Sequence, residues 1–477
     1  MSLIRRTGSW WSVTSTRARW TAVGASVLVL GLLTTSVIVW TSPANPINEA
    51  VAAVSKEQIQ QDKVLAERNA LLSQVIALQK QLTNSKLGLS ASKAQLATIQ
   101  QQLWSAQGAL DAAQTASVAV KAPARKPTSK PTSKPAAVTA ALSVPTKAQI
   151  MAPTSRYFGL FTDQAPFNWA SFNGVGVKIG SQPNAVGYFG GWDQNFRGDV
   201  VKAAWQRNTL PVLTWESRPI GAANNQIEAP AYSLPKIIGD PAAGVPGDFD
   251  AYLHQYAKDI VASGLPLGIR LDHEMNGSWY PWAEDNGKGT AINGNRPGDY
   301  VKMWQHVHDI FEQEGANSLV VWVWAPNIVN NLPAAHKASA YLDGLYPGDK
   351  YVDVVGLSGY LRPAYKPENN FTFDYTFGAS LKELRRVTSK PILLAEIGAS
   401  ETGGHKVAWI NSLFAALAKP ENKDIIGFSW FNLAVTTYTE GELATNDWRI
   451  ESRPESLAAF STGLAGAGDN FILKPAQ

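Results

Sequence analysis

The chain has 477 residues, a net charge of +4 and no cysteine. Its length exceeds that of one ordinary domain, so several segments are expected, and the lack of cysteine excludes disulfides and thiolate metal sites. The small charge does not indicate a nucleic-acid-binding face. The 17 tryptophans stand out, because a sugar-binding cleft uses such rings, although a large core would hold them as well.

The first predicted element is a transmembrane anchor at residues 20–40. This run, WTAVGASVLVLGLLTTSVIVW, contains no charged residue, and as a helix it would span about 30 Å, the thickness of a bilayer core. Residues 1–19 are basic, so the positive-inside rule predicts a cytoplasmic N-terminus and a single-pass protein of the cell membrane, with the rest extracellular. A cleaved signal peptide is the alternative, but its apolar region is usually shorter.

Residues 47–116 are predicted to form a helical coiled-coil stalk. Apolar residues recur every seven positions, at Val75, Leu82, Leu89, Leu96, Leu103 and Leu110. The partner core position is weaker, because it holds Leu78 and Ile99 but also Ser85, Ser92, Ala106 and Ala113. Self-association into a homo-oligomer is favoured over a single amphipathic helix, because an isolated polar helix gains little stability without packing.

Residues 117–150 are predicted to be a Pro/Lys-rich linker. The part KAPARKPTSKPTSKPAAV, at 121–138, repeats the unit TSKP and contains no aromatic residue. Such a segment cannot build a core, so it should be extended and solvated.

Residues 151–466 are predicted to form an α/β domain, a (β/α)8 TIM barrel, with a short tail at 467–477. Short apolar runs alternate with helix-length stretches, as expected for buried parallel strands and their connecting helices. The expected strands are 156–161, 175–179, 210–215, 267–271, 319–324, 352–357, 392–395 and 426–430. A doubly wound sheet is disfavoured, since it would place a Gly-rich phosphate loop after the first strand, where this chain has TDQAP.

The candidate catalytic residues are Glu274 and Glu396, which follow the fourth strand and end the seventh. In such a barrel, function gathers at the carboxyl ends of the strands. A Glu buried there is costly unless it has partners or a task. A retaining glycosidase needs two carboxyl groups about 5–5.5 Å apart, one protonated and one ionised. Either Glu alone is equally compatible with a structural ion pair.

Aromatic and polar residues stand near the ends of most expected strands. Sugar rings pack their C–H faces on aromatic rings, and their hydroxyls need polar partners. We therefore predict substrate contacts from Trp215, His273, Trp279, Trp282, Trp324, Asn327, Tyr360 and Trp430. Taken singly, any of these tryptophans fits a core better than a binding site, but together they favour a sugar cleft.

With these residues, the sequence resembles glycoside hydrolase family 26, a family of retaining barrel enzymes best known for β-mannanases. The matching stretches are RLDHEMNGSWYPW at 270–282, VWVWAPN at 321–327, YPGDKYVDVVGLSGY at 346–360 and KPILLAEIG at 390–398. The resemblance covers roughly residues 150–465 and does not extend to the first third of the chain.

The resemblance implies roles for single residues. Glu274 would be the acid/base and Glu396 the nucleophile, while His273 would contact substrate near the cleavage point. Tyr360 would donate to the nucleophile, and Trp430 would form the floor under the reacting sugar. In several mannanases of the family an Arg follows that Trp, whereas this chain has Phe431. This departure leaves the lichenase, endoglucanase and β-1,3-xylanase activities of the family open.

The predicted function is hydrolysis of internal β-1,4 linkages in a cell-wall type polysaccharide, with β-mannan as the first candidate and an endo-β-glucanase or lichenase as the alternative. A non-catalytic surface protein that binds glycan or organises the cell wall is a third interpretation, although binding alone needs no opposed carboxylates. The expected partners are the polysaccharide and the membrane, with no cofactor and no nucleic acid.

A metal hydrolase is disfavoured. His306 and His308 do not share a helix face, and Asp272, His273 and Glu274 alternate along a strand, so neither set can converge on one ion.

Overall fold

The computed structural model describes residues 142–224, 226–362, 371–439 and 442–475. The predicted anchor at 20–40, the stalk at 47–116 and most of the predicted linker lie outside these residues. Among the described residues, no helix combines the length and apolarity that a membrane crossing requires.

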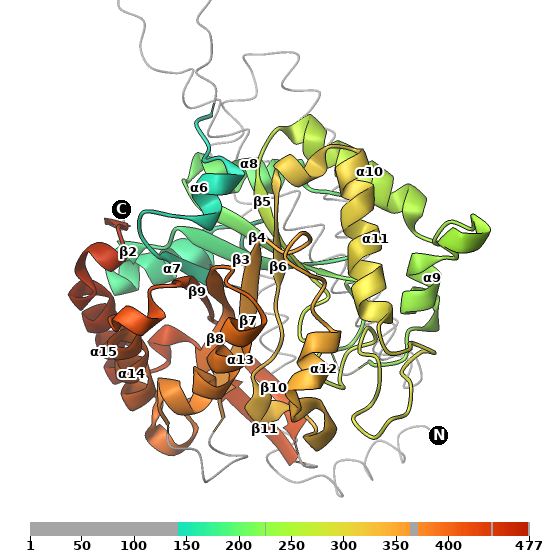
Figure 1. Cartoon of the computed structure of the whole chain (residues 1–477). Coiled ribbons are helices and arrows are strands. Elements are labelled where there is room, and N and C mark those ends of the chain that lie inside the picture. The colour runs from blue at the N-terminus through green and yellow to red at the C-terminus, as the bar shows by residue number, and fades with distance from the viewer. Residues whose placement is uncertain (1–141, 225, 363–370, 440–441, 476–477) are drawn as a thin grey trace, which may run out of the picture. The chain divides into compact units, whose positions relative to one another are not determined.

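Eight parallel strands close into a barrel in the order β1-β3-β4-β5-β6-β7-β8-β9 (Figure 1). This confirms the predicted (β/α)8 fold for the described part of the chain. Most strand residues are buried, as expected for parallel strands that are covered on both faces. The strands are β1 (Tyr157–Phe161), β3 (Ala185–Gly191), β4 (Leu210–Glu216), β5 (Leu267–Leu271), β6 (Val320–Trp324), β7 (Val354–Leu361), β8 (Ile392–Ala399) and β9 (Ile425–Phe431).

Helices surround the barrel and cover its outer face (Figure 1). Their buried residues recur at three- and four-residue spacing, as in α11, where Tyr300, Met303, Trp304 and Val307 face the strands. The main helices are α7 (Ala170–Ile179), α8 (Gly198–Gln206), α9 (Leu234–Ile238), α10 (Asp250–Ser263), α11 (Asp299–Gln313), α12 (Ser339–Gly344), α13 (Ala379–Val387), α14 (Lys406–Leu417) and α15 (Pro454–Gly466).

The second strand differs from its prediction. Residues 175–179, expected as a strand, form the end of α7, and the strand is β3 at Ala185–Gly191. The run VGVKI alternates like a strand, but Val177 is 58% exposed while Phe172, Val175 and Ile179 are buried at helical spacing. β3 contains three glycines, and glycine weakens the strand signal in a sequence.

A short helix, α6 (Lys147–Met151), packs at the amino ends of the strands, so the last residues of the predicted linker belong to the domain. Ile150 is buried, and the Lys147 ammonium lies 2.7 Å from the carboxylate of Asp353, which directly precedes β7. Lys147 also donates to the carbonyl oxygen of Asn317, ahead of β6. The described chain therefore enters the barrel at the face opposite the carboxyl ends of the strands.

Two further strand pairs were not predicted. The hairpin of β10 (Ala434–Thr439) and β11 (Glu442–Asp447) follows β9 and lies at the opposite end of the barrel from α6 (Figure 1). Within the predicted tail, β12 (Lys474–Pro475) pairs with β2 (Ser181–Gln182). The tail thus continues the folded domain beyond α15.

Candidate active site

The turn that carries Glu274 follows β5 and is held by several hydrogen bonds. The Glu274 amide donates to the carbonyl oxygen of Ala325 at 2.7 Å. The Asp272 carboxylate accepts from both the amide and the hydroxyl of Ser217, each at 2.7 Å. Asp272 and Glu274 have positive φ angles of 39° and 56°. Non-glycine residues adopt this region at some cost, and such strain gathers at functional sites.

The environment of the Glu274 side chain favours its protonated form. The residue is 7% exposed, and burial is the main cause that raises the pKa of its carboxyl group, followed by the negative charge of Glu396. The indole of Trp279 donates to Glu274 Oε2 at 2.8 Å. That hydrogen bond, one from the Asn327 side chain and the charge of Arg270 oppose the shift and lower the pKa of Glu274 in part.

Glu396, in β8, is surrounded by donors instead. The Arg270 guanidinium and the Tyr360 hydroxyl donate to its two carboxylate oxygens. Arg270 is fully buried and also donates to the hydroxyl oxygens of Thr214 at 2.9 Å and Ser358 at 3.0 Å. These bonds join β4, β5, β7 and β8 across the barrel interior. They hold one carboxylate oxygen of Glu396 against a cation and the other against a phenol.

The two glutamates lie close enough to influence each other and shared neighbours. The charge of Glu396 raises the pKa of Glu274. After burial, the main cause, both charges also raise the pKa of Tyr360 and of Tyr280. The pKa of the Glu274 carboxyl group is thus raised, while the Glu396 carboxylate accepts a hydrogen bond from a guanidinium. Acid/base and nucleophile roles require two carboxyl groups in such unequal surroundings.

His273 lies beside the pair as a neutral ring. It is 1% exposed, and burial, followed by the charges of Arg270 and Arg218, holds the pKa of its imidazole well below the usual value. Its Nδ1 has no hydrogen-bond partner among the described residues. Its carbonyl oxygen accepts from the Trp282 indole at 2.8 Å, and Tyr280 packs on its ring at 4.8 Å between centroids. Trp282, which is itself fully buried, therefore holds the backbone of His273 in place.

A buried ion pair, absent from the predicted site, lies next to these aromatic rings. Glu216 and Arg218 form two hydrogen bonds of 3.0 Å, with both side chains 5% exposed. The Arg218 guanidinium lies over the rings of Tyr280 and Trp282, at 5.1 and 5.4 Å from their centroids. Strand alternation was the signal available in the sequence, because Trp215 and Glu216 must point to opposite faces of β4.

The structure does not bring Trp215, Trp324 and Trp430 to the site. All three are fully buried and lie between the strands and the outer helices. Trp215 stacks on Tyr256 of α10 at 4.4 Å between centroids, and Trp430 lies edge-on to Trp409 of α14 at 5.8 Å. The expected floor under the sugar is therefore not Trp430, because its ring points away from the barrel interior.

Trp448, which the sequence analysis missed, lies beside Tyr360 instead. Its ring is 4.8 Å from that of Tyr360 and 5.6 Å from that of Phe431, measured between centroids. The Arg362 guanidinium lies over both Tyr360 and Trp448. The Trp448 indole nitrogen is buried and has no partner within the described part of the chain. Trp448 directly follows the β10–β11 hairpin, which brings it next to Tyr360. Residue spacing along the sequence could not reveal this contact.

Hollows border the barrel mouth near the ends of β1 and β3. The ring of Phe161 lies 5.4 Å from that of Phe189 and 5.9 Å from that of Phe431. One hollow of about 240 Å³ is lined by Phe161, Phe189, Ile220 and Leu433 among others. A second, of about 260 Å³, shares Phe189 and reaches Asp193 and Arg197. Apolar rings and polar side chains thus continue outward from the site.

Among the residues that the structure describes, no three His, Asp or Glu side chains converge in a way that could hold a metal ion.

A closed parallel barrel with two buried glutamates at its strand ends is typical of one class of glycoside hydrolases. Residues 171–402, which include strands β3 to β8 of the barrel, match the model of glycosyl hydrolase family 26.

Two curated proteins illustrate the relationship. Endoglucanase H of Acetivibrio thermocellus is 29% identical over 332 residues, which are 65% of this chain and 32% of that protein. A mannan endo-1,4-beta-mannosidase of Bacillus subtilis is 23% identical over 225 residues, which are 42% of this chain and 56% of that protein. The chain thus spans about a third of the first relative and about half of the second.

Among solved structures, the catalytic domain of the GH26 endo-beta-1,4-mannanase of Bacillus sp. JAMB-750 superposes with a TM-score of 0.48. The two are 17% identical, over 69% of this chain and 89% of that domain.

Proposed function

We propose that this chain is a retaining glycoside hydrolase that cleaves internal β-1,4 linkages of a β-mannan type polysaccharide. The observation that carries the proposal is the unequal environment of Glu274 and Glu396 at the mouth of a family 26 barrel. A glycan-binding protein without catalysis would need neither a carboxyl group of raised pKa nor a second one held by Arg270 and Tyr360.

The proposed reaction has two steps. In the first, a carboxylate oxygen of Glu396 attacks the anomeric carbon while the Glu274 carboxyl group gives its proton to the departing glycosidic oxygen. In the second, the Glu274 carboxylate takes a proton from water, whose oxygen attacks the same carbon and releases Glu396. Two inversions leave the anomeric configuration unchanged.

The neighbouring residues fit supporting roles. The Tyr360 hydroxyl and Arg270 fix the orientation of Glu396, so its lone pair stays directed at one position. We assign a hydrogen bond to a sugar hydroxyl to His273, whose Nδ1 is buried and has no partner among the described residues. We assign the apolar surface under the reacting sugar to Trp448, in place of Trp430.

β-Glucan is the second candidate substrate. One curated relative is named an endoglucanase and another a mannan endo-1,4-beta-mannosidase. Phe431 supplies no charge or hydrogen-bond donor at the position where several mannanases of the family have Arg. Comparing product release from mannan and from mixed-linkage β-glucan separates the two.

We further propose that residues 20–40 anchor the protein in the cell membrane, with the N-terminus cytoplasmic and the barrel extracellular. The support is the uncharged run at residues 20–40, which follows a basic segment. The stalk at 47–116 would join copies of the chain through its heptad positions.

The decisive experiment measures reducing-sugar release from mannan, mixed-linkage β-glucan and carboxymethyl cellulose. We expect Glu274→Ala and Glu396→Ala to lower turnover by about 10²–10⁴-fold while oligosaccharide binding persists. Glu421→Ala is the control, because the Glu421 side chain is 64% exposed on the outer surface. If either variant keeps turnover within tenfold of the parent, the assignment fails.

Added azide distinguishes the two roles on an activated aryl glycoside. In Glu274→Ala, azide should attack the glycosyl intermediate and give an azide of retained configuration. In Glu396→Ala, azide should replace the nucleophile itself and give an inverted product. The reverse pattern would exchange the two assignments.

A further inference from the structure

We propose that His336, protonated on both ring nitrogens, is a positioning residue for Glu274. It clamps the loop after β6 to the turn after β5, and the proposal rests on the acid/base role of Glu274 given above. His336 lies on the 3-10 helix η6 (Ala334–Lys337) and was not among the predicted site residues.

Both nitrogens of the His336 ring face groups that accept hydrogen bonds. Nδ1 lies 2.9 Å from the carbonyl oxygen of Asn276, and Nε2 lies 3.0 Å from Oδ1 of Asp285. A carbonyl oxygen cannot donate, so Nδ1 must carry a proton. A carboxylate cannot donate either, so Nε2 must carry one as well. The two contacts together require the imidazolium form.

The state of Asp285 supports this assignment. Burial alone would raise the pKa of its carboxyl group, but hydrogen bonds from His336 and from the Gly287 amide lower it below the usual value. Asp285 is therefore the ionised partner, and the shared proton belongs to the ring of His336. The Asp285 side chain is 23% exposed, whereas the His336 side chain is 1% exposed.

The surroundings of the ring suit a buried cation. Tyr341 of α12 stacks on it, with 3.9 Å between centroids and 9° between planes, so the charge lies over an aromatic face. Lys337 is its chain neighbour. Glu284 precedes Asp285, and burial raises the pKa of its carboxyl group to about 7. The titratable groups around His336 are thus Asp285, Tyr341, Glu284 and Lys337.

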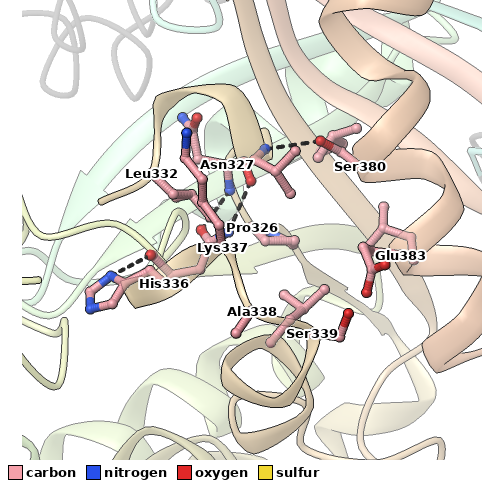
Figure 2. A pocket seen from close by; sticks show the side chains of 14 residues that line it. Pro326, Asn327, Leu332, His336, Lys337, Ala338, Ser339, Ser380 and Glu383 are labelled. Carbon is pink, nitrogen blue, oxygen red and sulfur yellow. Dashed lines mark hydrogen bonds between the residues drawn. The ribbon is translucent and has the colours of Figure 1, made fainter. Parts of the chain in front are cut away.

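A chain of hydrogen bonds connects this clamp to Glu274. The Asn276 side chain donates to the carbonyl oxygen of Asn327 at 2.9 Å and accepts from its amide at 2.8 Å. The Asn327 side chain hydrogen-bonds the Glu274 carboxyl group. Figure 2 shows His336 with its hydrogen bond on one side of Asn327, and Ser380 on the other. The amide of Gly277 also donates to the Glu274 carbonyl oxygen at 2.9 Å.

Loss of the clamp would therefore free the turn that carries Glu274 and Trp279 without touching either residue. Proton donation to the leaving group depends on the position of Glu274, whereas attack by Glu396 does not. The expected defect is selective for substrates whose leaving group needs a proton.

The kinetic test compares the polysaccharide with a 2,4-dinitrophenyl glycoside, whose leaving group departs without protonation. For His336→Ala we expect kcat/KM to fall about tenfold on the polysaccharide and less than about threefold on the aryl glycoside. His336→Gln, which can donate to Asn276 but not to Asp285, should show a smaller selective loss. Equal loss on both substrates would mean a merely structural residue and would overturn the proposal.

His254→Ala is the matched control. His254 also pairs with a carboxylate, Glu314 at 2.7 Å, but on the outer helices and with its side chain 33% exposed. Its removal should leave both kcat/KM values within about twofold, because a surface pair contributes little.

A second measurement does not depend on activity. Nitrogen-15 spectra of the full chain, with the His336 signal assigned from His336→Gln, should show the imidazolium form in the parent at pH 7. In Asp285→Asn, with the anion removed, the same ring should be neutral at that pH. A neutral His336 in the parent would refute the clamp. If the parent cleaves no glycan, the proposed function fails, and these spectra still decide whether the clamp exists.

Discussion

At the residue scale, the two glutamates differ through their neighbours. Burial and the charge of Glu396 raise the pKa of Glu274, while Arg270 and Tyr360 hold Glu396 with hydrogen bonds. Both differences arise from contacts that join separate strands, so the order of the residues alone does not reveal them. The Arg270 guanidinium reaches from β5 across the barrel to Ser358 of β7 and Glu396 of β8.

Replacing Trp279 tests how its hydrogen bond affects the pKa of Glu274. Its indole hydrogen bond favours the ionised carboxylate and so lowers the pKa of Glu274. Trp279→Phe removes that bond, which raises the pKa further. Because the acid form then persists to higher pH, the alkaline limb of kcat/KM should move to higher pH. We expect kcat/KM at the optimum to fall about tenfold through looser positioning. An alkaline limb that moved to lower pH would contradict this account.

Much of the site could be predicted from single residues, and the three tryptophans that were wrongly placed there share one physical cause. The barrel mouth holds four predicted residues, Glu274, Glu396, His273 and Tyr360. The glutamates and the histidine could be predicted because burying such a side chain at a strand end costs free energy unless it has a partner or a function. Trp215, Trp324 and Trp430 do not gather there, since side chains alternate along a strand. Once Glu216 is taken to point inward, Trp215 must point outward toward α10.

At the element scale, long-range contacts account for what the sequence could not predict. Seven of the eight predicted strands are strands of the barrel. The eighth barrel strand, β3, is hidden by its glycines, and the run at 175–179 that imitates a strand belongs to α7. Trp448 reaches Tyr360 only because the β10–β11 hairpin folds back over the barrel end. The clamp at His336 likewise joins two loops that lie 60 residues apart in the chain.

The packing around Gly187 explains why this position of β3 is a glycine. A Cβ added there would lie 2.3–2.5 Å from ring atoms of Phe161, over which the Arg270 guanidinium is placed. Gly187→Ala should therefore destabilise the fold by about 1–3 kcal/mol, because the packed ring must move. It should also lower kcat, because Arg270 positions Glu396. Thermal unfolding and turnover measure the two effects.

Gly174→Ala is the control for that change. Gly174 lies in α7, and an added Cβ there would meet nothing within 4 Å. Alanine favours a helix over glycine by up to about 1 kcal/mol, so the control should be neutral or stabilising. A similar loss of stability in both variants would exclude the packing argument.

At the scale of the whole molecule, residues 142–475 contain a closed barrel whose described core draws on every strand. A chain that starts at residue 142 should therefore fold by itself. We expect its Tm to lie within about 2 °C of the full chain and its kcat/KM on a soluble oligosaccharide within about twofold. An aggregated or inactive fragment would show that the barrel depends on the preceding residues.

The position of α6 has a consequence for large substrates. The incoming chain is held at the base of the barrel by Lys147 and Ile150, while both glutamates lie at the far rim. A polymer laid across that rim can extend past it in both directions without passing around the point of attachment. This arrangement would suit the proposed cleavage of internal linkages, because a long polysaccharide could cross the site without its ends being threaded into the barrel.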